Sequence, residues 1–79
     1  MNKNNYEKTF KNGDKVKIKL DNYKNKKTSP AFQQFLKENG DQIFTIRIED
    51  KYKDSEIYGI EENHIWLFHA VDLEKIEGE

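Results

Sequence analysis

The side chains of this 79-residue chain that could carry chemistry are its two histidines and a group of carboxylates in its second half. In a regular strand, His64 and His69 project to opposite faces and do not form a two-histidine metal site. Paired carboxylates bind hard cations or exchange protons, but these lack calcium-loop spacing and have no activated nucleophile or phosphate-binding glycine loop nearby. The sequence therefore indicates no enzyme, no metal site and no cofactor. The carboxylates of this acidic group are Asp50, Asp54, Glu56, Glu61 and Glu62.

A second set of charged side chains is basic and lies in the first half of the chain. Over residues 14–20 lysines alternate with apolar residues, which places the lysines on the outer face of a strand. Ammonium groups that follow phosphates beside an aromatic ring are typical of nucleic-acid-binding domains. Outward lysines also keep a strand soluble and discourage pairing of an exposed edge, so both interpretations stay open. The basic candidates are Lys15, Lys17, Lys19, Tyr23, Lys24, Lys26 and Lys27.

Three aromatic residues near the acidic group form the other candidate surface. Aromatic side chains with polar tips are enriched where proteins contact each other, and we expect Tyr52, Tyr58 and Trp66 to be partly exposed. Trp66 shares a strand face with Phe68, which we assign to the core, so packing is the alternative role of Trp66. The candidate protein-binding set is Trp66, Tyr58, Tyr52, Glu61 and Glu62.

The elements that must position these residues are short strands joined by tight turns. Alternation of apolar and polar residues directs Phe44, Ile46 and Ile48 to the core and Thr45 and Arg47 outward. The expected strands cover 14–20, 42–49, 56–60, 64–68 and 73–76, with a 3₁₀ turn over 70–72.

One helix is predicted over residues 30–39. Ser29 and Pro30 are typical of a helix start, because the serine caps a free N–H and proline has none to leave unpaired. The spacing of Phe32, Phe35 and Leu36 gives one apolar stripe. Gly40 is expected to end the helix in a left-handed conformation.

Two segments carry a resemblance to a known family. Gly13-Asp14-Lys15-Val16-Lys17-Ile18 and Trp66-Leu67-Phe68-His69-Ala70-Val71-Asp72-Leu73-Glu74 resemble the Src homology 3-like small barrels of bacteria and phages. The resemblance covers residues 10–78. It implies a mainly β fold, namely a small barrel of four to five antiparallel strands with one short helix inserted in the first long loop. It also implies a function in binding, without indicating one particular ligand. His69 stands where peptide-binding members have a proline, and their Ala-Leu-Tyr-Asp-Tyr type segment is absent, so proline-rich peptides are not the expected ligands.

Length and composition limit the alternatives. The chain is long enough for one domain, which we place at 10–79 after a flexible segment at 1–9. Cysteine is absent, and no apolar stretch approaches the ~20 residues of a membrane span, so we expect a cytoplasmic protein with no membrane partner. Abundant lysine, asparagine and isoleucine point to an AT-rich bacterial or phage genome.

The two halves of the chain differ in charge. Residues 1–40 carry ten basic and four acidic side chains, whereas residues 41–79 carry four basic and eleven acidic ones. We expect the halves to attract each other in the fold, although such asymmetry also marks partner surfaces.

The function that we expect from the sequence is a small non-enzymatic binding module. The leading hypothesis is protein–protein interaction, as a phage or mobile-element accessory that binds or inhibits a host protein. The alternative is a nucleic-acid-binding small barrel that uses the basic face of the first strand and the loop after it. We expect a monomer or a weak homo-oligomer.

Overall fold

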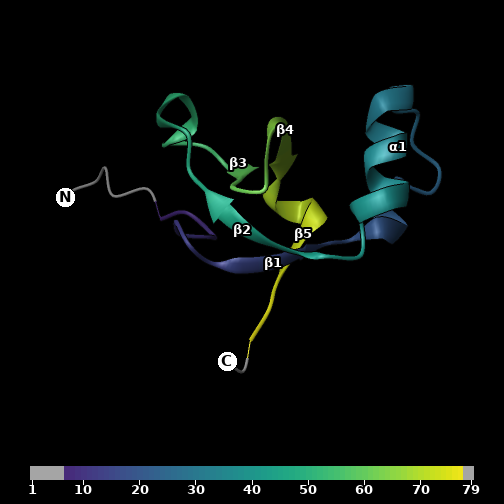
Figure 1. Ribbon diagram of the computed structural model, residues 1–79. Coiled ribbons are helices and arrows are strands. Elements are labelled where there is room, and N and C mark those ends of the chain that lie inside the picture. Colours follow the sequence, from purple (N-terminus) through teal and green to yellow (C-terminus); the bar gives the residue numbers. More distant parts are fainter. Residues whose placement is uncertain (1–6, 78–79) are drawn as a thin grey trace.

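Five antiparallel strands build the domain (Figure 1). The computed structural model describes residues 7–77, so residues 1–6 of the expected flexible segment lie outside the described part. The strand order β4-β3-β2-β1-β5 leaves β4 and β5 at the two edges. The mainly β prediction with one helix is confirmed at this level. The strands are β1 (Lys15–Ile18), β2 (Ile43–Arg47), β3 (Ile57–Ile60), β4 (Asn63–His69) and β5 (Leu73–Lys75).

The predicted helix is present as α1 (Pro30–Asn39), between β1 and β2. Ser29 accepts a hydrogen bond from the backbone N–H of Phe32 at 3.2 Å, and Pro30 occupies the first turn. The left-handed end expected at Gly40 is wrong, because Gly40 has a right-handed φ of −65°. A Cβ there would clash with the backbone carbonyl oxygen of Leu36 and would also lie 2.8 Å from a methyl carbon of Leu20, so close packing accounts for the glycine.

Three short 3₁₀ turns complete the connections. η1 (Leu20–Tyr23) follows β1, η2 (Asp50–Tyr52) lies between β2 and β3, and η3 (Ala70–Asp72) joins β4 to β5. The turn predicted over 70–72 is confirmed. In Figure 1, α1 stands at one end of the sheet and the η2 loop at the other.

Strand β1 lies in the interior of the sheet, between β2 and β5. Val16 pairs with Phe44 on one side and with Lys75 on the other. The interpretation of the β1 lysines as protection of an exposed edge is therefore wrong. Their outward direction is confirmed, since Lys15 and Lys17 are exposed while Val16 is fully buried.

The hydrophobic core lies between the sheet and α1. Phe10, at the start of the expected domain, belongs to it, and Lys8 just before it donates a hydrogen bond to the Tyr52 carbonyl at 3.0 Å. Phe44 and Ile46 are buried as predicted, whereas Ile48 is only partly buried. The buried apolar residues are Phe10, Val16, Ile18, Phe32, Phe35, Phe44, Ile46, Tyr58, Ile60, Phe68 and Leu73.

Contacts between the halves of the chain agree with their opposite charges. Lys17 on β1 pairs in register with Glu74 on β5, and the Nζ of Lys26 lies 3.7 Å from the carboxylate of Asp72. Within residues 7–77 no helix is long and apolar enough to cross a membrane.

Candidate functional site

The edge strand β4 contains a bulge, at which its pairing with β3 shifts in register. Tyr58 on β3 pairs with Phe68, and Ile60, two residues further along β3, pairs with Asn63, five residues before Phe68. β4 therefore has three more residues than β3 between these pairs, in the segment 64–67. Bulges re-aim side chains and interrupt edge pairing. A strand without such a shift was expected here, and the irregular pairing corrects that expectation, whereas residues 65–69 still alternate between exposed and more buried positions.

Apolar side chains project from this bulge. Ile65 is 74% exposed and Leu67 is 42% exposed, whereas Trp66 between them is half-buried. The Trp66 ring packs edge-on against Phe32 of α1, with centroids 5.1 Å apart. The asparagine Asn63 supports the start of the bulge, because its side-chain oxygen accepts a hydrogen bond from the Ile65 N–H at 2.9 Å. Trp66 thus anchors the bulge while its neighbours face outward.

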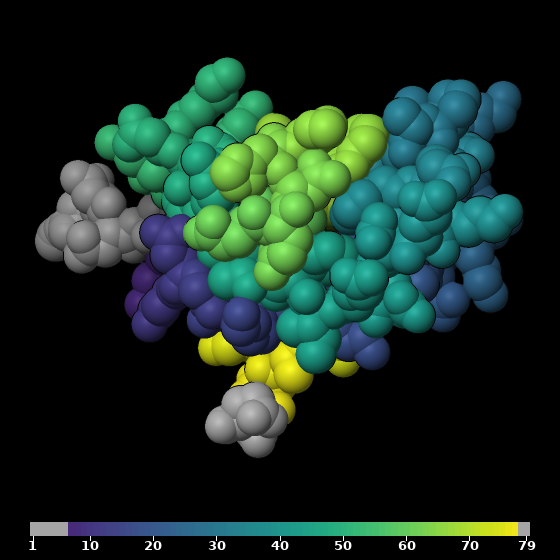
Figure 2. All heavy atoms as spheres, viewed as in Figure 1, coloured from purple at the N-terminus to yellow at the C-terminus, as the bar shows by residue number. Residues whose placement is uncertain are grey.

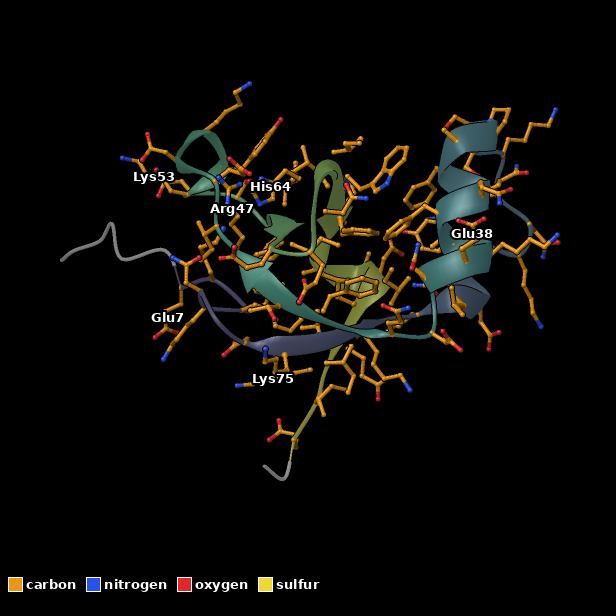
Figure 3. All side chains as sticks on the ribbon, viewed as in Figure 1. Glu7, Glu38, Arg47, Lys53, His64 and Lys75 are labelled. Carbon is orange, nitrogen blue, oxygen red and sulfur yellow. The ribbon has the colours of Figure 1, made fainter. Side chains whose placement is uncertain are left out.

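The bulge and the η2 loop enclose a hollow of about 230 Å³. Tyr52, which the sequence singled out, lines it together with His64 on the bulge. Figure 3 shows His64 on the η2 side of the molecule, far from Glu38 on α1. In Figure 2 the light-green atoms around residue 60 and beyond stand forward between the η2 loop and α1. We call the residues of this hollow, with Trp66, the bulge surface: Glu49, Lys51, Tyr52, His64, Ile65, Trp66 and Leu67.

Tyr58 does not belong to the bulge surface, because its side chain is fully buried and its expected exposure is wrong. The Tyr58 hydroxyl donates a hydrogen bond to the carboxylate of Glu56 at 2.6 Å and accepts one from the Phe10 N–H at 3.2 Å. Burial, together with the bond to Glu56, raises the pKa of Tyr58 to about 12. The Tyr58 hydroxyl thus has hydrogen-bond partners inside the domain, so the polar group does not indicate contact with another protein.

The two turn glutamates of the candidate set have different surroundings. The Glu62 carboxylate accepts hydrogen bonds from the Thr45 backbone N–H at 3.0 Å and from the Thr45 hydroxyl at 2.8 Å. Burial alone would raise the pKa of Glu62, but these bonds more than offset it and lower the pKa. Glu62 therefore fastens the β3–β4 turn to β2, while Glu61 is exposed in the same turn.

The predicted basic candidates separate into two groups. On β1, the Lys15 ammonium donates a hydrogen bond to the Thr45 hydroxyl at 2.7 Å, and its charge lowers the pKa of Glu62. Lys17 and Lys19 line a hollow of about 450 Å³ that they share with the carboxylates of Asp21, Asp41 and Glu74. The positive charge of β1 is therefore largely balanced by nearby carboxylates.

The second basic group gathers beside α1. Tyr23, Lys24 and Lys26 line a hollow of about 430 Å³ with Lys37, a residue that the sequence did not single out. Lys27 is exposed in the same loop, but it does not line the hollow. We call this site the basic hollow, and its lining residues are Leu20, Tyr23, Lys24, Lys26, Thr28, Gln33, Leu36 and Lys37.

The buried carboxylate of Asp72 fixes the loop that forms the basic hollow. Asp72 is 5% exposed and accepts a hydrogen bond from the Asn22 side chain at 2.9 Å. The Lys26 ammonium lies 3.7 Å from the same carboxylate. Burial and the neighbouring Asp72 charge raise the pKa of the Tyr23 hydroxyl, which also hydrogen-bonds to Asp72. One carboxylate thus holds three side chains of the segment between β1 and α1.

Replacing Asp72 with alanine is expected to loosen this segment. The change removes the carboxylate that accepts from Asn22 and Tyr23, and Asn22 keeps only its bond to the Val71 carbonyl. We expect a cost of about 2 kcal/mol in the free energy of unfolding, because the exposed Lys26 ammonium can return to water and adds little to the loss. Amide hydrogen exchange over residues 20–28 should accelerate more than exchange in β2 and β3. Equal acceleration in all strands would contradict a local anchoring role.

The structure adds functional candidates that sequence reasoning missed, namely Ile65, Leu67 and Lys37. One signal for the bulge was available, because Gly59 interrupts the strand expected at 56–60 and glycine inside a strand often marks a bulge. Within residues 7–77 no group of three or more metal-ligating side chains is gathered.

No protein-family model, no curated protein and no solved structure matches the chain.

Proposed function

We propose that this domain is a non-enzymatic binding module that inserts the apolar tip of its bulge surface into another protein. The observation that carries the proposal is the exposure of Ile65 and Leu67 on a projecting bulge. Large apolar side chains grouped on a surface mark interaction sites more often than scattered ones do.

The proposed partner presents an apolar pocket with a basic rim. Ile65 and Leu67 supply the apolar contact, and exposed Glu61 lies at the preceding turn, where it would face the rim. Tyr52, beside the bulge, supplies an aromatic ring with a polar tip, a residue type enriched in protein interfaces. A host protein bound by a phage or mobile-element accessory is the partner class that we favour.

We also propose that the fold is a Src homology 3-like barrel. Its support is the chain order: a first strand, a long connection with the helix, three strands joined by short connections, and a 3₁₀ turn before the last strand. β1 pairs with both β2 and β5, which brings the two ends of the domain together in the sheet. Folds of this kind serve many functions, so the function is argued from the bulge surface.

The test is a double substitution on the bulge. Ile65→Ser with Leu67→Ser removes two apolar side chains that the partner would bury, at about 1.5 kcal/mol or more each. We expect binding to weaken by at least tenfold, measured by titration calorimetry with a partner captured from a bacterial lysate treated with nuclease. The two side chains are exposed, so the variant should unfold at the temperature of the unchanged protein.

The matched control is Ile43→Ser, which removes another exposed isoleucine, 53% exposed, from the start of β2. The control should bind within twofold of the unchanged protein. A partner that binds the folded double variant as tightly as the unchanged domain would exclude the bulge surface as its contact.

A further inference from the structure

We propose that the basic hollow beside α1 binds the phosphate backbone of single-stranded nucleic acid. This site lies on residues that the bulge surface does not use, so the proposal is independent of the proposed protein-binding function.

The charge of the basic hollow carries the first step of the argument. Every charged residue that lines it is a lysine, namely Lys24, Lys26 and Lys37. All its lining residues belong to the segment 20–37, and from residue 22 to residue 37 that segment contains four lysines and no carboxylate. The hollow is therefore positive, unlike the β1 face, where carboxylates line the same hollow as Lys17 and Lys19.

Two nearby carboxylates reduce this charge without cancelling it. Asp21 lies 3.6 Å from Lys24, but both side chains are largely exposed, and such pairs exchange readily with other charges. Asp72 holds Lys26 from the buried side. No ion pair among the described residues 7–77 involves Lys37, so its ammonium group is available to an anion.

The shape and the remaining lining residues favour a flexible strand. The side chains of Leu20 and Leu36 give apolar contact for sugars and bases, and Thr28 and Gln33 supply polar groups. Lys26 lies 5.0 Å from the centroid of the Tyr23 ring and covers one of its faces. The backbone phosphates rather than stacked bases should therefore dominate affinity, and little sequence preference is expected.

The experiment measures fluorescence anisotropy of a labelled 20-nucleotide oligothymidylate with the full-length protein, from 50 to 300 mM NaCl. Three lysine–phosphate contacts predict a slope of about −2 for log K against log salt, because each contact with a single strand contributes about −0.7. A duplex of equal length should bind less tightly. No binding at 50 mM NaCl, or equal affinity for the duplex, overturns the proposal.

Two variants and a matched control locate the site. Lys24→Gln with Lys37→Gln leaves the Lys26–Asp72 pair intact and should weaken binding by about tenfold, and adding Lys26→Gln should weaken it further. The control carries Lys15→Gln, Lys17→Gln and Lys19→Gln, which remove the same charge as the triple variant from β1 and the residue that follows it. The control should stay within threefold of the unchanged protein. Equal losses in the folded triple variant and the control would overturn the assignment to the basic hollow.

Discussion

Replacing Phe32 with alanine is expected to lower the free energy of unfolding by about 4 kcal/mol, the middle of the range for large aromatic side chains truncated in cores. A domain of this size is stabilised by roughly 4–12 kcal/mol in total. The substitution should therefore remove about a third or more of the stability of the domain.

The size of this effect follows from the position of Phe32 among the aromatic rings. Its ring lies 5.4 Å from that of Tyr23 in η1, 5.1 Å from that of Trp66 in the bulge and 5.9 Å from that of Phe68 in β4. It thus joins the loop of the basic hollow, the helix and the bulge surface. Edge-to-face ring contacts add to the area buried, so the loss exceeds that of one isolated apolar side chain.

Thermal and urea unfolding measure the effect, and Leu36→Ala is the control. Leu36 lies one turn further along α1 and is only partly buried, so its truncation should cost less than half as much. Equal losses in the two variants would show that the helix is held by its whole apolar stripe and that Phe32 has no special role.

Local patterns were sufficient to predict most of the fold. The alternation around Val16, the Ser29 cap and the stripe of Phe32 and Phe35 act over a few residues. The helix formed over the predicted residues 30–39, and β1 formed within the predicted range 14–20 but is shorter, because η1 begins at Leu20. The 3₁₀ turn over 70–72 is likewise a local feature. The neighbours of β1 are a tertiary property, and the lysine pattern alone could not show that β5 covers its second edge.

The candidate site was less predictable, because the pairing of β4 is a tertiary property. Alternation along β4 already places Ile65 and Leu67 on the face opposite Trp66 and Phe68, but it does not show the three extra residues at 64–67 that form the bulge. The exposure of Tyr58 was also predicted wrongly because it depends on a distant contact. Glu56, which accepts from the Tyr58 hydroxyl, is only two residues away, but Phe10, whose N–H donates to that hydroxyl, lies 48 residues earlier in the sequence.

Alkaline pH is expected to destabilise the domain through Tyr58. The pKa of its hydroxyl is about 12 in the folded protein, whereas an unfolded tyrosine ionises near pH 10. Because the folded pKa is raised, the stabilisation is fully present below pH 10 and is lost as the pH rises toward 12. Two pKa units correspond to about 2–3 kcal/mol. Tyr23, whose pKa is also raised, adds to the loss in the same direction.

Replacing Tyr58 with phenylalanine separates this contribution from the rest. At pH 7 the variant loses the hydroxyl's bonds with Glu56 and Phe10 and should be about 1–2 kcal/mol less stable. Between pH 10 and 12 its stability should fall less steeply than that of the unchanged protein, because among the tyrosines of residues 7–77 only Tyr23 still has a raised pKa. Urea unfolding at pH 7, 9, 10 and 11 measures both effects. Parallel curves for the two proteins would mean that Tyr58 ionises as easily in the fold as outside it, which its burial between Phe10 and Glu56 should prevent.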